Sequence, residues 1–332
     1  MTSLALLPDA TSPLEHATAE AAFADILDWR CDPDDVARFL TDMSLRDETS
    51  VEIAACARAM RARMIEVAAP EGAIDVCGTG ADGQHSLNIS TAVAIVVAAC
   101  GVPVAKHGNR AASSKAGAAD TLEALGLDLD IAAATAERSL ADIGIAFLFA
   151  QKHHPTLAAL APIRRRICRR TVFNLVGPLC NPARVTRQLI GVARPDFMPV
   201  YAGALELLGT EAAMLVAGDE PLDELSIAGP STIVRIGRCG EGTLRIAPSD
   251  AGLPSHPLSA LRGDDAAYNA AALQRLLQGE PGAYRDAVLL NSAAALMVAG
   301  RVNTLAEGVE EAGEIIDNGL ANALLRCWID YR

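Results

Sequence analysis

Short apolar runs alternate with longer segments of helical periodicity from residue 73 onward. Runs of strand length occur at 73–77, 102–105, 145–149, 188–192 and 212–217, and two further β-rich stretches follow at 231–236 and 243–246. Segments of helical length fit 89–100, 114–125, 133–142, 196–208, 265–279, 283–299, 305–318 and 320–330. Because strands that alternate with helices form sheets covered on both faces, the pattern predicts an α/β fold with a mostly parallel central sheet.

The N-terminal stretch, residues 12–68, has helical periodicity and no strand pattern. Asp32-Pro33 is an N-cap followed by a proline at the first helical position, and Thr49 or Ser50 can cap a further helix. We therefore predict a small helical domain over 1–70, with an oligomer contact, and an α/β domain over 71–332. Ordinary core packing explains the apolar stripe of the helical block equally well.

A glycine-rich loop separates the first predicted strand from the first helix of the α/β region. Gly78, Gly80 and Gly83 follow the strand, and Asn88 with Ser90-Thr91 stands where the helix begins. Glycine allows backbone N–H groups to approach a ligand closely, and a helix N-terminus favours an anion. The loop therefore predicts a phosphate site, although a βα turn without a ligand remains the simpler alternative.

Two common phosphate motifs do not explain this loop. Gly78-x-Gly80-x-x-Gly83 fits the dinucleotide fingerprint, but that fingerprint also needs an acidic residue about 20 residues further on. No Asp or Glu lies between Asp82 and Asp120, and Lys106 follows the second predicted strand instead. A P-loop is excluded because no Lys-Ser or Lys-Thr follows the glycines at the required spacing. A loop for another phosphorylated ligand remains, with Lys106 beside it.

The charges of the chain are unevenly distributed. The formal net charge is -13, which disfavours binding to nucleic acid or to an anionic membrane. Nevertheless residues 83–119 and 143–195 contain no acid, and the second of these stretches contains Lys152, Arg164, Arg165, Arg166, Arg169, Arg170, Arg184, Arg187 and Arg194. If the two stretches meet, they form a site for a small, highly charged anion. A solvated basic helix face is the alternative.

The composition indicates a protein of the reducing cytosol. Hydrophobic residues make up 51% of the chain and aromatic residues 4%, so the apolar content is mostly aliphatic. None of the eight cysteines forms a CxxC pair, which favours free thiols over disulfides or a zinc site. The N-terminus lacks the basic region of a signal peptide, and the longest apolar run, 92–105, is broken by glycine and proline. We therefore expect a cytoplasmic location and no membrane span.

Two further groups carry candidate chemistry. Asp223-Glu224 follows a buried strand, and paired carboxylates suit Mg²⁺ that also binds substrate phosphates, although acidic pairs are common on surfaces. His153-His154 precedes Arg164, whose guanidinium fork matches a planar carboxylate. For the histidines, a structural role is as reasonable as ligand contact.

These motifs, in this order, resemble the anthranilate phosphoribosyltransferase family of tryptophan biosynthesis. The resemblance covers almost the whole chain, including the helical block. It rests on Gly78-Thr79-Gly80-Ala81-Asp82-Gly83 with Asn88-Ile89-Ser90-Thr91, on Lys106-His107-Gly108-Asn109-Arg110 with Ser113-Ser114, on 171–179 with Asn181-Pro182, on Leu222-Asp223-Glu224 and on Leu290-Asn291-Ser292-Ala293. It implies a fold like that of nucleoside phosphorylases and phosphoribosyltransferases, usually as a homodimer, and Mg²⁺-dependent transfer of phosphoribosyl from phosphoribosyl diphosphate to the amine of anthranilate.

The resemblance also implies a set of site residues. Phosphoribosyl diphosphate would contact Gly78, Ala81, Asp82, Ser86, Asn88, Ser90, Thr91, Lys106, Ser114 and Ala118. Anthranilate would contact Gly78, His107, Asn109, His154, Arg164 and Gly177. The metal would be held by Ser90, Asp223 and Glu224, and catalysis would depend most on Lys106, Asn109 and Arg164.

The implied chemistry agrees with the residue types. Departure of diphosphate from C1 of ribose builds negative charge on the leaving group, which Mg²⁺ and Lys106 would stabilise. The aromatic amine of anthranilate is already neutral, so positioning it beside C1 supplies much of the acceleration without a strong base.

Several positions depart from the pattern of the family. Ala81 stands where the family usually has glycine, and Ala118 stands where it often has serine. These two departures place individual phosphate contacts in question. Cys168 replaces a usual glycine, Gln151 a usual proline, and Pro221 a usual glycine before the acidic pair. A pyrimidine nucleoside phosphorylase and a non-catalytic nucleic-acid-binding relative are the alternative functions.

Overall fold

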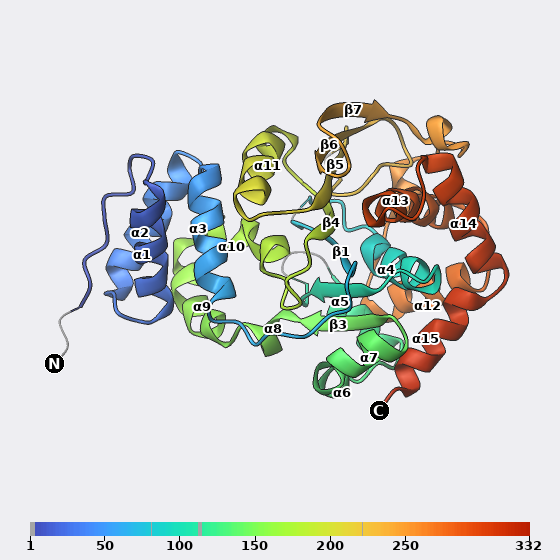
Figure 1. The fold of residues 1–332 in the computed structure, drawn as a ribbon, viewed down its shortest axis with the longest axis horizontal. Coiled ribbons are helices and arrows are strands. Elements are labelled where there is room, and N and C mark those ends of the chain that lie inside the picture. The colour runs from blue at the N-terminus through green and yellow to red at the C-terminus, as the bar shows by residue number, and fades with distance from the viewer. Residues whose placement is uncertain (1–3, 81, 112–114, 221) are drawn as a thin grey trace.

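The computed structural model describes residues 4–80, 82–111, 115–220 and 222–332. Three N-terminal helices lie at one end of the elongated molecule, and the α/β region forms the rest (Figure 1). The helices are α1 (His16–Leu27), α2 (Pro33–Leu45) and α3 (Ser50–Arg61). The expected caps are present, because Asp32 accepts from the backbone N–H of Asp34 at 2.8 Å and Thr49 forms a capping box with Glu52.

A seven-stranded sheet forms the centre of the α/β region. In chain order the strands are β1 (Ile74–Gly78), β2 (Val104–Gly108), β3 (Ile145–Phe149), β4 (Arg187–Gly191), β5 (Ala212–Gly218), β6 (Ser231–Gly237) and β7 (Gly242–Ile246). Their order across the sheet is β3-β2-β1-β4-β5-β6-β7. The first five are parallel, whereas β6 and β7 pair antiparallel at one edge. The mostly parallel sheet predicted from the sequence is therefore confirmed.

The predicted position of the second strand was wrong by a few residues. Residues 102–105 were expected to form it, but β2 covers Val104–Gly108 and pairs with β3 from Val104 to Gly108. Gly101 has φ 85°, and Pro103 has no N–H to donate to a neighbouring strand, so pairing begins after them. Lys106 and His107 consequently lie inside a buried strand rather than in the loop that follows it.

Both faces of the sheet are buried beneath helices. One apolar cluster joins Leu189 and Val216 to α4 (Ile89–Ala99) and to the C-terminal helices, and a second joins Ile190 and Leu215 to α3 and α11 (Met198–Leu207). Neighbouring residues of one strand thus face opposite cores. Further helices of this region are α5 (Ala118–Ala124), α6 (Leu129–Ala134), α7 (Ala136–Asp142), α12 (Ala266–Leu277), α13 (Ala283–Ala299), α14 (Leu305–Asp317) and α15 (Leu320–Asp330).

Some predicted helices differ in extent from the structure. The segment predicted as one helix over 133–142 lies in two short helices, α6 and α7, which meet at Thr135. In the described part of the segment predicted over 114–125, residues 115–125, the helix is α5, which begins at Ala118. The segment predicted over 196–208 begins with a 3₁₀ turn, η2 (Pro195–Phe197), before α11.

Three helices between β3 and β4 were not predicted. They are α8 (Ala150–His153), α9 (Pro155–Ile167) and α10 (Val172–Leu175), and a 3₁₀ turn, η1 (Gly177–Cys180), follows them. Pro162 lies inside α9, and Pro is unfavourable in a helix interior, so the sequence pattern concealed this helix. Burial of Leu160 and Ile163 in the same cluster as Phe23 and Leu40 stabilises it against α2.

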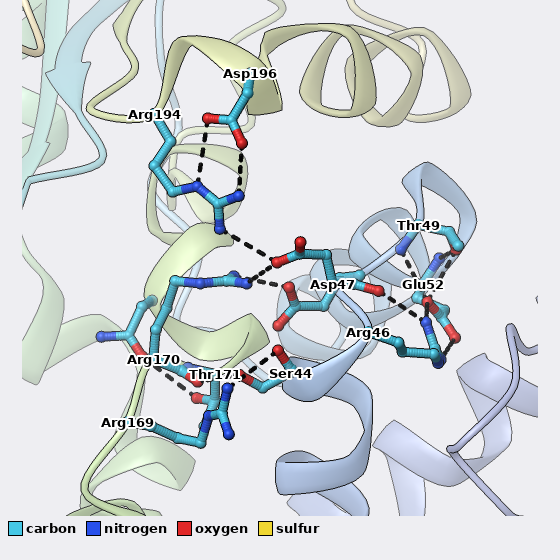
Figure 2. Close-up of polar contacts among 12 residues, drawn as sticks. Ser44, Arg46, Asp47, Thr49, Glu52, Arg169, Arg170, Thr171, Arg194 and Asp196 are labelled. Carbon is cyan, nitrogen blue, oxygen red and sulfur yellow. Dashed lines mark hydrogen bonds and ion pairs between the residues drawn. The ribbon is translucent and has the colours of Figure 1, made fainter. Parts of the chain in front are cut away.

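A polar network attaches the helical end to the α/β region (Figure 2). Asp47, in the turn between α2 and α3, accepts from Nη2 of Arg170 at 2.9 Å and from Nη1 of Arg194 at 3.2 Å. Both guanidinium groups stack on the ring of Phe197, at 5.2 and 5.0 Å from its centroid. The hydroxyl of Ser44 donates to the backbone carbonyl of Arg170 at 2.7 Å. The turn is therefore attached to two separate segments of the α/β region.

Beneath this network lies a buried carboxylate. The side chain of Glu48 is fully buried, and its Oε2 lies 2.7 Å from Nη1 of Arg170. Burial raises the pKa of Glu48, and the charge of Arg170 opposes that shift. Arg170 is thus the cation that faces Glu48, whereas Arg194 pairs with Asp196 and with the half-exposed Asp47.

Arg170→Met should destabilise the protein by about 3 kcal/mol, because it leaves a buried carboxylate without its cation. Arg194→Met is the matched control, since it removes a second guanidinium from Phe197 and Asp47, and should cost at most about 1 kcal/mol. Adding Glu48→Gln to Arg170→Met should restore part of the loss. Urea unfolding followed by circular dichroism measures all three, and equal losses for the two arginine variants would contradict this role.

Candidate active site

The predicted phosphate and metal residues meet at the carboxyl ends of the central strands. Lys106 projects from β2 and is only 2% exposed. Its ammonium donates to the backbone carbonyl of Val76 at 2.8 Å and to the hydroxyl of Ser90 at 3.2 Å. The backbone of Ser90 also lies near enough to the carboxylate of Glu224 to lower the pKa of that carboxyl, and Lys106 lowers it too. Lys106 and the acidic pair therefore belong to one site.

Two glycines allow the loop that carries Asp223 and Glu224, the acidic loop, to approach the ends of the strands. A Cβ at Gly78 would lie 2.2 Å from Oδ2 of Asp223, and one at Gly191 would lie 1.5 Å from the Asp223 carbonyl oxygen. Any other residue at these positions would displace the loop. The backbone N–H of Gly80 donates to Oδ2 of Asp223 at 2.7 Å. The predicted phosphate loop and the predicted metal residues are thus in direct contact.

The carboxylates of the site repel one another. Burial and the neighbouring Asp82 raise the pKa of Asp223 to about 7. Burial and the nearby Asp223 also raise the pKa of Glu224, and Lys106 opposes that shift. Such a donor set fits a divalent cation, which would relieve the repulsion. Within the described ranges, no group of three or more His, Cys, Asp or Glu side chains is arranged to hold a metal ion.

Lys106 has a buried counter-ion that sequence reasoning missed. Burial lowers the pKa of Lys106, and the charge of Asp75 on β1 is the largest opposing influence. Asp75 accepts from Nδ2 of Asn181 at 2.8 Å and from the backbone N–H of His107 at 3.1 Å. A carboxylate in the middle of an apolar strand was the available signal, because buried charges are normally paired.

A second group of predicted residues lies beside η1. Nδ1 of His107 lies 3.1 Å from the carbonyl oxygen of Gly177, and the rings of His107 and His154 are 5.2 Å apart. Burial and the neighbouring histidine lower the pKa of His107 to about 3. Burial and His153 lower that of His154 to about 4. Both rings are therefore neutral at pH 7, and their Nε2 atoms have no hydrogen-bond partner within the described residues.

The remaining predicted anthranilate residues are Arg164 and Asn109. Arg164 lies in the last turn of α9, and no hydrogen bond or ion pair joins its half-buried guanidinium to another described residue. Burial lowers its pKa. The side-chain oxygen of Asn109 accepts from the backbone N–H of Arg110 at 2.8 Å and from Gln151 at 3.4 Å. Gln151 and Arg110 also line a neighbouring cavity of about 610 Å³.

The other residues that were predicted to contact phosphate lie in different environments. Asn88 is the N-cap of α4, and Ser86 pairs with Arg262 in an isolated β-bridge. Thr91 is buried, and its hydroxyl has no partner within the described residues. Ala118 is the first residue of α5, next to Gly108. Ala81, Ser114 and Pro221 lie outside the described residues.

Comparison with known proteins decides the family. Two family models match, "Glycosyl transferase family, a/b domain" over residues 70–322 and "Glycosyl transferase family, helical bundle domain" over 10–64. Anthranilate phosphoribosyltransferase of Novosphingobium aromaticivorans is 62% identical over 327 residues, covering 98% of this chain and 99% of the relative. That of Sphingopyxis alaskensis is 61% identical over 98% of each chain. The chain belongs to the anthranilate phosphoribosyltransferase family.

Solved structures of this family share the fold. Anthranilate phosphoribosyltransferase of Thermus thermophilus superposes with a TM-score of 0.91 at 40% identity, covering 96% of both chains. The Saccharomyces cerevisiae enzyme, solved in complex with PRPP and Mg, gives 0.88 at 30% identity over 96% of this chain and 93% of that one. The reaction of this family is the transfer of phosphoribosyl from phosphoribosyl diphosphate to anthranilate in tryptophan biosynthesis. A nucleoside phosphorylase is not favoured.

The neutral histidines make stability depend on pH. A base whose pKa is lowered by folding leaves the native state fully stable above the unfolded pKa of about 6.5, and stability falls as the pH drops toward the folded value. His107 and His154 should each destabilise the ligand-free protein by about 1.4 kcal/mol between pH 7.5 and 5.5. Asp223 acts in the opposite direction, because its raised pKa favours protonation in the folded state.

Comparison with variants isolates the histidine contribution. His154→Gln should reduce the loss of unfolding free energy between these pH values by about 1 kcal/mol relative to the unsubstituted protein. His85→Gln, at an exposed position, is the control. Urea unfolding at both pH values measures the difference, and an unchanged pH dependence in His154→Gln would show that this ring is not held neutral.

Proposed function

We propose that phosphoribosyl diphosphate binds between the glycine-rich loop and the acidic pair. The observation that carries this is the close approach of Asp223 to Gly78 and Gly80, with Lys106 hydrogen-bonded to Ser90 and its charge close enough to lower the pKa of Glu224. Donors, a buried cation and two carboxylates converge there, as a diphosphate with its metal requires. Gly78, Asp82, Ser86, Asn88, Ser90 and Lys106 are the described residues assigned to this substrate, with Thr91 and Ala118 as neighbours.

Mg²⁺ is assigned to Ser90, Asp223 and Glu224. A relative from yeast was solved with PRPP and Mg, which supports the same pairing here. When bound, the metal neutralises charge that develops on the departing diphosphate. Lys106 would stabilise the same charge, and its buried position would make that interaction stronger than it would be in water.

Anthranilate is assigned to the second group of residues. The unpaired guanidinium of Arg164 is suited to its carboxylate, while the neutral rings of His107 and His154 and the backbone at Gly177 would contact its ring. Asn109 would complete the site between the two substrates. No described residue has to act as a strong base, because the aromatic amine is already neutral and needs mainly to be held beside C1.

A homodimer and a cytoplasmic location complete the proposal. Leu6, Trp29 and Leu45 on the helical unit are 90%, 44% and 65% exposed, and this supports a subunit contact there. The matches over residues 10–64 and 70–322 support a domain boundary near residue 70. No helix among the described residues is long and apolar enough to span a membrane.

Anthranilate fluorescence provides the direct test. Mixing the protein with anthranilate and phosphoribosyl diphosphate should abolish the fluorescence in the presence of Mg²⁺, and the rate should collapse when EDTA removes the metal. Nucleoside phosphorolysis by the same preparation should be absent. Persistent fluorescence with Mg²⁺, or phosphorolysis of pyrimidine nucleosides, would refute the proposed activity.

Arg164→Ala should raise KM for anthranilate by about tenfold or more, since it removes a charge-assisted pair with the carboxylate. KM for phosphoribosyl diphosphate should change little. Arg165→Ala, at the adjacent exposed position of α9, is the matched control and should leave both constants unchanged. Steady-state kinetics with each substrate varied in turn will decide, and equal losses for both substrates would contradict the assignment.

Glu224→Gln should increase the Mg²⁺ concentration needed for half-maximal activity by about tenfold, because an amide replaces a charged metal ligand. Glu220→Gln, in the same loop before the acidic pair, is the matched control. Mg²⁺ titrations at saturating substrates measure the shift. An unchanged Mg²⁺ requirement in Glu224→Gln would remove this residue from the proposed metal site.

A further inference from the structure

Asn88 occupies an N-cap position but does not cap its helix. Asparagine at this position normally accepts a hydrogen bond from a backbone N–H of the first turn. Here the side chain makes no such bond to α4. Its Oδ1 instead accepts from the hydroxyl of Thr121 on α5 at 2.6 Å and from Nδ2 of Asn269 on α12 at 3.0 Å. Two helices remote in sequence therefore hold this one oxygen.

The orientation of both amides follows from a backbone donor. The N–H of Asp264 donates to Oδ1 of Asn269 at 2.9 Å, and a backbone N–H can only donate. Nδ2 of Asn269 must therefore face Asn88, so Asn88 must present its oxygen there. Oxygen and nitrogen of an amide are otherwise assigned from the network alone, and here the network begins at an unambiguous donor.

We call the hydrogen bonds from Asp264 through Asn269 to Asn88, together with the one from Thr121, the relay. Its surroundings leave it little freedom to move. Asn269 is 2% exposed and Thr121 is fully buried. A Cβ at Gly263 would lie 2.8 Å from Oδ1 of Asn269, so glycine permits the approach of the loop. The hydroxyl of Tyr284 donates to the backbone carbonyl of Asn88 at 3.1 Å. Both the backbone and the side chain of Asn88 are thus held from α12 and α13.

We propose that Asn269 and Thr121 are positioning residues that fix the amide of Asn88 with its NH₂ group directed toward the phosphoribosyl diphosphate. The inference rests on the proposed placement of that substrate at the glycine-rich loop. With its oxygen engaged by two donors, Asn88 offers only N–H groups to a ligand. A reversed amide would present an oxygen to an anion and repel it, so the relay determines whether Asn88 attracts or rejects the substrate.

Asn269→Asp tests the relay with nearly unchanged shape. The new carboxylate still accepts from Asp264, but its second oxygen faces Oδ1 of Asn88 and favours reversal of that amide. We expect affinity for phosphoribosyl diphosphate with Mg²⁺, measured by calorimetry, to fall by about tenfold or more. KM for anthranilate should not change. Asn318→Asp introduces the same charge at an exposed position outside the relay and is the matched control.

A double-mutant cycle with Asn88→Ala identifies the route of the effect. If Asn269 acts through Asn88, then Asn269→Asp should cause no further loss of affinity once Asn88 is alanine. Additive losses would overturn the proposal, as would unchanged affinity in Asn269→Asp. Thermal unfolding confirms that each variant folds. Should Asn269→Asp not fold, Thr121→Val is the substitute, with a loss of a few fold that also disappears in the Asn88→Ala background.

The outcomes separate this inference from the proposed function. If the unsubstituted protein does not consume anthranilate, the proposed function fails regardless of the relay. If it is active but Asn88→Ala binds phosphoribosyl diphosphate normally, Asn88 is not a ligand and the relay is overturned while the activity stands.

Discussion

The burial of one lysine ammonium among carboxylates is the constraint on which this site depends. Lys106 lies inside the sheet, 2% exposed, and the charges of Asp75, Glu224 and Asp223 oppose the lowering of its pKa by burial. An isolated buried charge is strongly unfavourable, so Lys106, Asp75 and Glu224 are stable only together. The same arrangement leaves the outer carboxylates repelling one another. A metal–diphosphate ligand would resolve that conflict, which makes the free site electrostatically complementary to its substrate.

The parallel sheet brings these charges together. The ends of β1, β2, β4 and β5 lie side by side, so loops far apart in sequence meet at one edge. The glycines at 78 and 191 remove the Cβ atoms that would hold the acidic loop away. Sheet topology and the absence of two side chains therefore determine how closely the glycine-rich loop and the loop of Asp223 approach each other.

Much of this arrangement could be predicted from residue patterns, and the exceptions have physical causes. Alternating strands and helices indicated the sheet, and the acid-free stretches indicated an anion site. Helix α9 was not predicted, because Pro162 is unfavourable in a helix interior. Its stability comes from burial of Leu160 and Ile163 against distant helices, which no local pattern records. The relay from Asp264 to Asn88 could not be predicted, since it joins residues far apart in sequence.

The departure at Cys168 is explained by backbone conformation. This residue ends α9 at φ 52° and ψ 27°, in the left-handed region that glycine adopts without strain. The glycine that the family usually has at this position would adopt this conformation without strain, whereas Cys168 adopts it at some cost. The thiol partly compensates by donating to the carbonyl of Arg165 at 3.0 Å.

The two substrates are assigned to parts of the fold that are held in place differently. The diphosphate residues are attached to the sheet, whereas Arg164 belongs to α9, which packs on α2. The segment that follows α9 is fastened to the helical unit through Arg170, Asp47 and Glu48 (Figure 2). The connection from α3 is fixed on α8, because Ile65 and His153 exchange hydrogen bonds of 2.8 and 3.0 Å. With these assignments, the distance between the amine of anthranilate and C1 of ribose would depend on how the helical unit sits on the sheet. A substitution at that contact, far from either substrate, would alter the reaction by displacing one substrate relative to the other.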